Sequence, residues 1–321
     1  MVRVGFLALA VVLLMLALRA QGPQALDAAR AVGPVAAVAS LVAVVVGLLA
    51  SAMVWRALLG DLGTRLPLRP ALHVFFLGQL GKYVPGSVFA IAAQMELGRA
   101  HGAPRSRVGT TGLLFMGVLV AAGLLTAAVT LPLTSPETLR DYSWVLVVLP
   151  VGLVALAPPV LTRLVGLLLR LLRRDPLERP LSWRGTGSAL GWALVMWAAY
   201  GVHLFVLVRT QELGDDAPDR LLLSTGAYAL AWTAGFLFVV APAGFGVREL
   251  ALVVALAPVL DSGAALALAG LSRVLMTLGD LGWGAVGALL RPGAVRAGSG
   301  GEATEVAGVT KVKSEGSSAE S

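Results

Sequence analysis

The sequence predicts an all-α polytopic membrane protein with about eight transmembrane helices and one or two broken or re-entrant segments. Hydrophobic residues make up 57% of the 321 residues, and charged residues make up only 13%, about half the share that is usual in soluble domains. A soluble domain of this size has too few charges to cover so much apolar surface. The apolar residues also fall in runs that approach the ~20 residues needed to cross the hydrocarbon core of a bilayer.

Eight apolar runs give the predicted spans in chain order. They are Met1–Leu18, Ala31–Trp55, Val108–Leu131, Ser143–Leu161, Gly187–Val208, Leu221–Val240, Leu250–Leu260 and Ala264–Leu290. The first run resembles a signal peptide, but a cut after Ala20 would place Leu18 where a small residue is needed. This favours an uncleaved first span over a cleaved leader.

Arginine clusters in the loops predict the orientation of the spans. The clusters are Arg56, Arg65 and Arg69; Arg99, Arg105 and Arg107; and Arg170, Arg173, Arg174, Arg179 and Arg184. Basic loops face the cytoplasm, so we expect all three clusters and both termini on the cytoplasmic side of a bacterial plasma membrane. The formal net charge of +7 then reflects an anionic leaflet rather than nucleic acid. The membrane domain is expected to cover 1–292, and the Gly-, Ser- and Glu-rich tail 293–321 to be disordered.

The segment 71–95 is apolar enough to cross the membrane, yet basic clusters flank it on both sides. A complete crossing would send the five-arginine cluster outside. We therefore favour a re-entrant segment, broken at Pro85-Gly86, over a full span. Irregular backbone at membrane depth is tolerated where protein or water covers it.

A second break is predicted at Val240–Leu250, where Pro242, Gly244 and Gly246 interrupt the helix. The apolar stretch that follows is too short for a comfortable crossing, so it either tilts or forms a half-helix. Interrupted hydrophobic segments in corresponding halves of a chain are the best indication from sequence of a transporter's binding site.

The first break carries groups that suit an anion. Pro85 and Gly86 end one helix, and Ser87 is a plausible N-cap for the next. Free backbone N–H groups at a helix N-terminus, together with Lys82 and Tyr83, favour a phosphate or carboxylate. The alternative is that Lys82 extends to the cytoplasmic surface and Pro-Gly is only a turn.

The second break repeats this chemistry, because Gly244 and Gly246 free the backbone beside Arg248 and Glu249. Sequence neighbours on a helix point about 100° apart, so these two charges do not pair with each other. The candidate partners are Asp261 and Asp280 for Arg248, and Arg273 for Glu249. The alternative to a lipid site is a static ion pair that locks the helices together.

Other polar positions have simpler interpretations. Arg273 and Asp280 share one face of the last span, about 10 Å apart along the axis. Glu96 and Arg99 are spaced for an interfacial pair, and His203 is more typical of a hydrogen bond between helices than of a proton relay. Arg163, Arg170 and Arg174 recur among leucines, which predicts an amphipathic helix at the cytoplasmic surface.

Several chemistries lack their motifs. The sequence has no G-x-x-x-x-G-K-[ST] loop, no G-x-S-x-G elbow and no cluster with metal-ligand spacing. We therefore expect no cofactor, no metal and no catalytic residue.

The segments Gly78–Ser87 (GQLGKYVPGS) and Ala241–Leu250 (APAGFGVREL) resemble the flippase-like membrane region of lysylphosphatidylglycerol synthases, over about 10–292. The resemblance implies translocation of a phospholipid or a polyprenyl-phosphate-linked lipid, and standalone forms often accompany a glycosyltransferase. The large soluble aminoacyl-transfer domain is missing from this sequence, so no tRNA-dependent lysyl transfer is expected. The residues that the resemblance singles out are Lys82, Pro85, Gly86, Pro242, Gly244, Gly246, Arg248 and Glu249.

Three hypotheses remain open from the sequence. The first is a lipid translocase whose partner is a membrane lipid with an anionic headgroup. The second is a membrane glycosyltransferase or lipid-modifying enzyme that uses Glu249 or Asp280 as a base. The third is a non-catalytic scaffold for a glycosyltransferase.

Overall fold

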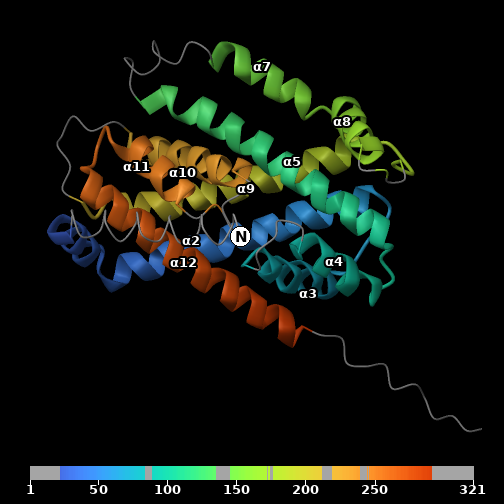
Figure 1. The fold of residues 1–321 in the computed structure, drawn as a ribbon, viewed down its shortest axis with the longest axis horizontal. Helices are drawn as coiled ribbons and strands as arrows, with labels where there is room; N and C mark the ends of the chain where they lie inside the picture. Colours follow the sequence, from blue (N-terminus) through green and yellow to red (C-terminus); the bar gives the residue numbers. More distant parts are fainter. Residues whose placement is uncertain are drawn as a thin grey trace, which may run out of the picture. The chain divides into compact units, whose positions relative to one another are not determined.

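The computed structural model describes residues 22–83, 89–134, 145–171, 173, 176–211, 219–238, 244 and 246–290, which form helices and no strand (Figure 1). The helices are α2 (Gly22–Asp61), α3 (Leu68–Gln79), η1 (Leu80–Tyr83), α4 (Phe89–Arg99), α5 (Arg105–Thr130), η2 (Pro132–Thr134), α7 (Val145–Ala155), α8 (Pro158–Leu171), α9 (Trp183–Val208), α10 (Arg220–Leu237), α11 (Val247–Leu256) and α12 (Ser262–Leu289). The all-helical class is confirmed. The predicted first span, the tail 293–321 and residues Pro85, Gly86, Ser87 and Pro242 lie outside the described residues.

The predicted count of about eight spans is not confirmed. Among the described residues, four helical stretches are long and apolar enough to cross a membrane: Ala29–Asp61, Arg105–Thr134, Trp183–Val208 and Ser262–Leu289. A fifth is possible if the bent pair α7 and α8 counts as one span. α10 and α11, predicted as separate spans, are not among them.

The long helices form the core, with α2 packed against α9 and α12. Small residues let them approach closely: Gly47 of α2 lies against the ring of Tyr200 on α9, and Gly279 of α12 lies against Val44 of α2. Glycine is used in this way where helices associate in lipid, because it brings the two backbones together. α2 is kinked at Gly33, whose φ is 62°.

The predicted span Ser143–Leu161 is wrong at its C-terminal end. α7 ends at Ala155 and α8 begins at Pro158 after a bend of 70°. The residue before a proline disfavours helical dihedrals, which accounts for the break ahead of Pro158. Along α8, Leu164, Leu167 and Leu171 are exposed beside Arg163 and Arg170, as expected of an amphipathic surface helix.

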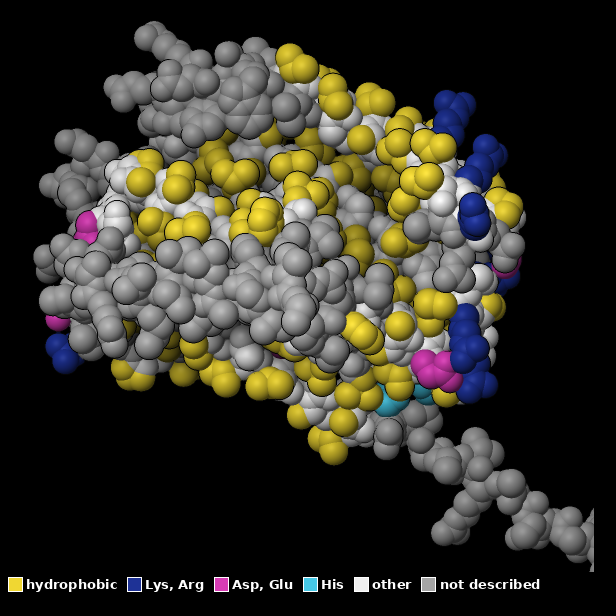
Figure 2. Space-filling model, in the orientation of Figure 1, with side chains coloured by type: hydrophobic (Ala, Val, Ile, Leu, Met, Phe, Trp, Pro, Cys, Tyr) yellow, Lys and Arg dark blue, Asp and Glu magenta, His cyan; other side chains and the backbone are white. Residues whose placement is uncertain are grey.

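Most of the Lys and Arg side chains visible in Figure 2 lie at one end of the helical bundle, which we call the basic end and define by Arg105, Arg107 and the residues that contact them. Arg107, at the start of α5, contacts the carboxylate of Glu178 before α9 and the carbonyl of Gly63 after α2. The Arg107 guanidinium also holds the pKa of Glu178 below its usual range. Asp61, at the end of α2, accepts hydrogen bonds from Ser182. The loop before α9, the loop after α2 and the start of α5 therefore meet at the basic end.

α3, η1 and α4 form a helical hairpin, the first hairpin, which enters and leaves the bundle at the basic end. α3 begins five residues after Gly63. At the end of α4, Glu96 forms ion pairs with Arg99 and with Arg105 of α5, which confirms the predicted Glu96–Arg99 contact. This geometry agrees with the re-entrant interpretation of 71–95.

α10 and α11 form a second hairpin, which enters from the opposite end. Gly226, near the start of α10, lies against Thr130 and Leu131 at the far end of α5. α11 begins beside Gly235, near the end of α10, and runs back along α10. α10 and α11 are therefore the two arms of one hairpin (Figure 1).

Candidate functional site

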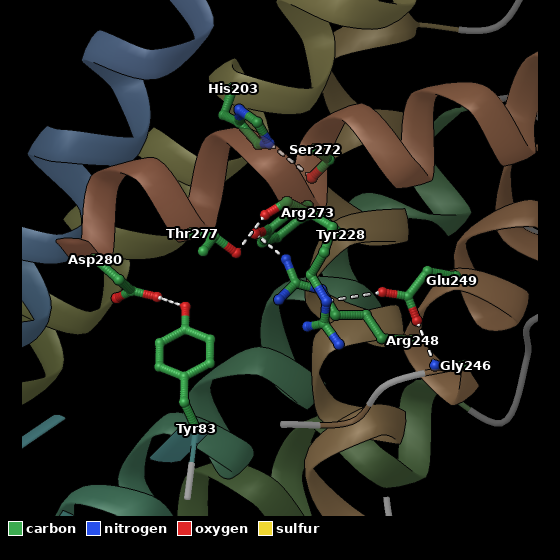
Figure 3. A network of polar contacts seen from close by, with 10 residues as sticks. All are labelled: Tyr83, His203, Tyr228, Gly246, Arg248, Glu249, Ser272, Arg273, Thr277 and Asp280. Carbon is green, nitrogen blue, oxygen red and sulfur yellow. Dashed lines mark hydrogen bonds and ion pairs between the residues drawn. The ribbon is translucent and has the colours of Figure 1, made fainter. Parts of the chain in front are cut away.

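The inner ends of the two hairpins meet the same helix, α12, near its middle. Lys82 and Tyr83 of the first hairpin contact Asp280, and Glu249 of the second contacts Arg273. The two α12 residues are seven apart, which is about 10 Å along a helix axis. The site is therefore a polar stripe on α12 with one hairpin at each end (Figure 3).

Asp280 receives two contacts on the same oxygen. Its Oδ2 lies 2.6 Å from Lys82 Nζ and accepts a hydrogen bond of 2.6 Å from the Tyr83 hydroxyl. The side chain of Asp280 is 6% exposed and that of Lys82 is 31% exposed. In this state Lys82 neutralises a buried carboxylate, rather than extending freely to the surface.

Glu249 uses each of its carboxylate oxygens differently. Oε1 forms an ion pair with Arg273 Nε at 3.1 Å, which confirms the predicted pair. Oε2 accepts a hydrogen bond of 2.7 Å from the backbone N–H of Gly246 at the N-terminus of α11. The expectation that Gly246 leaves its N–H free is therefore wrong, because a helix N-terminus attracts the nearest carboxylate.

Arg248 has neither of the partners predicted for it. Asp280 binds Lys82, and Asp261 caps α12 by accepting hydrogen bonds from Gly263 and Ala264. The Arg248 guanidinium instead donates to the Tyr228 hydroxyl and lies 4.6 Å from the centre of the same ring. No carboxylate among the described residues forms an ion pair with Arg248.

Tyr228 is the site residue that the sequence analysis misses. It lies in an apolar run of α10 and is fully buried, so in sequence it looks like an ordinary core aromatic. The signal that identifies Tyr228 is its spacing from Gly235, the residue of α10 that lies against Arg248. Tyr228 comes seven residues before Gly235, which is two turns along the same face of α10. A Cβ on Gly235 would lie 2.9 Å from the Cβ of Arg248, so the arginine starts beside Gly235 and reaches back to Tyr228.

Behind these groups, His203 joins three helices. Its Nδ1 lies 2.6 Å from Ser40 Oγ of α2, and its Nε2 lies 2.8 Å from Ser272 Oγ of α12. All three side chains are buried. The prediction of a hydrogen bond between helices at His203 is confirmed.

The second break requires glycine at the two positions that the structure describes. Gly244 and Gly246 have φ values of 67° and 83°, and residues other than glycine rarely adopt such positive φ values. Gly244 also lies against the backbone of Gly235. These two residues lie between α10 and α11, where Arg248 faces Tyr228 of α10 and Glu249 faces Arg273 of α12.

Comparison with known proteins gives one family. No curated protein matches the chain. The family described as the lysylphosphatidylglycerol synthase TM region matches residues 3–284, which include both hairpins and every residue of the site. With most of its length matched, the chain belongs to the lysylphosphatidylglycerol synthase TM region family.

Proposed function

We propose that this protein translocates a lipid with an anionic headgroup, a phospholipid or a polyprenyl-phosphate-linked lipid, across the plasma membrane. The family takes its name from the synthase of a phospholipid, lysylphosphatidylglycerol. Charged residues inside membrane proteins are costly, and they typically mark the path of a substrate or ion. Two broken helices that meet at one polar stripe are the arrangement in which transporters place their substrates.

The observation that carries the proposal is an excess of positive charge in the site. Lys82, Arg248 and Arg273 contribute three cationic groups, while Asp280 and Glu249 contribute two carboxylates. The site therefore has one net positive charge, which a monoanionic phosphodiester would neutralise.

Arg248 is the cation best placed to bind that phosphate. Its contacts with Tyr228 are a hydrogen bond and a cation–π interaction, the latter worth about 0.5–2 kcal/mol. A guanidinium binds phosphate through paired, charge-assisted hydrogen bonds that are stronger than a bond to a neutral hydroxyl. The N-terminus of α11, where Arg248 lies, adds the positive end of a helix dipole.

The test is translocation in proteoliposomes. Lipids labelled with a nitrobenzoxadiazole fluorophore on an acyl or prenyl chain are quenched by dithionite only in the outer leaflet, so exchange between leaflets is measured directly. We expect wild-type protein to exchange labelled phosphatidylglycerol or labelled polyprenyl phosphate, and Arg248→Ala to reduce the rate at least tenfold. The exposed Arg30→Ala is the matched control.

Each other outcome separates the hypotheses. Wild-type exchange in Arg248→Ala would remove the site assignment. A scaffold predicts no exchange above empty liposomes for any lipid, and it predicts that Arg248 and Glu249 tolerate substitution. An enzyme predicts a chemically altered lipid, which mass spectrometry of the same vesicles would detect.

A further inference from the structure

We propose that Tyr228 positions Arg248 for the lipid phosphate, and that its hydroxyl occupies the place of a phosphate oxygen until the lipid binds. The inference rests on the proposed function and assigns two roles to one side chain. The face of the ring holds the guanidinium in both states of the site, whereas the hydroxyl is a partner that the phosphate displaces.

Both ends of the Arg248 side chain contact α10. At the backbone end, a Cβ added to Gly235 would lie 2.9 Å from the Cβ of Arg248. At the other end, Arg248 Nη2 donates a hydrogen bond to the Tyr228 hydroxyl. Gly235 and Tyr228 are seven residues apart, which is about 10 Å along a helix axis. The arginine side chain therefore lies along α10, and this fixes where its guanidinium can bind a phosphate.

The Tyr228 ring contacts the guanidinium in two separable ways. Arg248 Cζ lies 4.6 Å from the centre of the ring, which is a cation–π contact with the face of the ring. The hydrogen bond goes to the hydroxyl at the edge of the same ring. A phosphate oxygen that replaces the hydroxyl on Nη2 can therefore leave the cation–π contact intact.

Other helices hold the tyrosine ring in place. His203 of α9 meets the Tyr228 ring edge to face, with ring centroids 5.6 Å apart and ring planes at 84° (Figure 3). The imidazole is fixed in turn by Ser40 of α2 and Ser272 of α12, at 2.6 Å and 2.8 Å. The guanidinium of Arg248 is thus positioned before the lipid arrives, and a positioned group loses less entropy when it binds.

The hydroxyl is a weaker acceptor than the phosphate. An arginine without a partner inside a membrane is costly, so the hydroxyl stabilises the empty site. A phosphodiester oxygen carries negative charge and accepts a stronger, charge-assisted hydrogen bond, so it displaces the hydroxyl. When the lipid leaves, the hydroxyl returns to Arg248 Nη2. The hydroxyl therefore opposes binding of the lipid and favours its release.

The experiment separates the two roles by replacing Tyr228 with phenylalanine and with leucine. Vesicles of digalactosyldiacylglycerol, a bilayer lipid without phosphate, contain increasing mole fractions of labelled phosphatidylglycerol. The dithionite assay then gives the maximal exchange rate and the half-saturating mole fraction. Tyr228→Phe keeps the ring face and removes the hydroxyl. We expect its half-saturating fraction to fall about tenfold, as for the loss of a competing hydrogen bond to a charged group, and its maximal rate to fall because release is slower.

Tyr228→Leu removes the ring face as well as the hydroxyl. We expect its half-saturating fraction to rise at least about threefold above the wild-type value, because Arg248 loses the cation–π contact that positions it. The matched control is Tyr200→Phe, which removes the hydroxyl of a neighbouring buried tyrosine. Within the described residues that hydroxyl forms no hydrogen bond with Arg248, so this variant should match the wild type.

Each contrary result overturns one role. A half-saturating fraction in Tyr228→Phe that equals or exceeds the wild-type value would show that the hydroxyl does not stand in for phosphate, since damage to the fold cannot tighten binding. Equal values for Tyr228→Leu and Tyr228→Phe would overturn the positioning role of the ring. Both results would leave lipid exchange itself standing. If wild-type protein exchanges neither labelled phosphatidylglycerol nor labelled polyprenyl phosphate, the proposed function fails, and the roles of Tyr228 fail with it.

Discussion

Glu249 is the residue on which both the start of α11 and its attachment to α12 depend. One oxygen holds the N-terminus of its own helix and the other holds Arg273. Within a membrane such a pair fixes the position of a hairpin more firmly than apolar contacts do, because lipid chains are as apolar as leucine. The pair should therefore contribute measurably to stability.

We expect Glu249→Gln to lower the free energy of unfolding in detergent by about 3 kcal/mol, because it removes the negative charge that faces Arg273 in a buried site. Glutamine can still accept the Gly246 N–H, so the loss reports on the ion pair. Arg273→Gln should cost a similar amount. The double variant should cost less than the sum of the two, with a coupling energy of about 1–2 kcal/mol.

The exposed pair Asp27–Arg30 is the matched control, with side chains that are 76% and 74% exposed. Asp27→Asn should change stability by less than about 1 kcal/mol. Strict additivity of Glu249→Gln and Arg273→Gln would show that the ion pair contributes nothing to the fold.

The first hairpin depends on close contact between its two arms, and at Gly81 an added Cβ would lie closer to the backbone of the other arm than at Gly78. A Cβ at Gly81 would lie 2.8 Å from the backbone N of Ala90 and 2.9 Å from its Cα. Backbone atoms cannot move aside as the end of a side chain can. The arms must separate to accept any larger residue.

Gly81→Ala is therefore expected to destabilise the protein by about 1–3 kcal/mol, the usual cost of overpacking, and to weaken the Lys82–Asp280 contact one residue away. Thermal unfolding in detergent measures the first effect, and labelled-lipid exchange measures the second. Gly117→Ala on α5 is the control, because no atom lies within 4 Å of the added methyl group. Equal melting temperatures for the two variants would contradict the packing argument.

The breaks in these hairpins are predictable from sequence, but the course of the second hairpin is not. Pro242 and the glycines at 244 and 246 mark the interruption by themselves. Apolar composition is the same for a helix that crosses a membrane and for one that returns, so α10 and α11 look like separate spans. Gly235 contacts both Arg248 and Gly244. These contacts join residues about ten apart in the sequence and show that the chain turns back.

The same limit applies to the site. The Glu249–Arg273 pair is predictable, because two opposite charges in apolar segments must find each other. The partner of Arg248 is not, because Tyr228 carries no charge and its ring suits an apolar core equally well. The neutral partner leaves Arg248 with the unbalanced positive charge, so the part of the site that composition does not reveal is the part on which the proposed function depends.

The arrangement of both hairpins defines two ends of the bundle, and the orientation of these ends in the membrane is open to a direct test. Ser106, in the first turn of α5, is exposed at the basic end. Ser262, at the start of α12, is exposed at the opposite end, since Gly287 near the other end of α12 binds His73 of α3. The chain contains no cysteine, so single cysteines report without interference.

Because basic loops face the cytoplasm, we expect a membrane-impermeant maleimide to label Ser262→Cys in intact cells and to label Ser106→Cys only after lysis. The serine-to-cysteine changes alter one atom at exposed positions and should leave the fold unchanged. Labelling of Ser106→Cys alone in intact cells would reverse the orientation, so that the first hairpin would open to the outside. Labelling of both from the same side would contradict hairpins that enter from opposite ends, and with it the meeting of Lys82 and Arg248 along one stripe of α12.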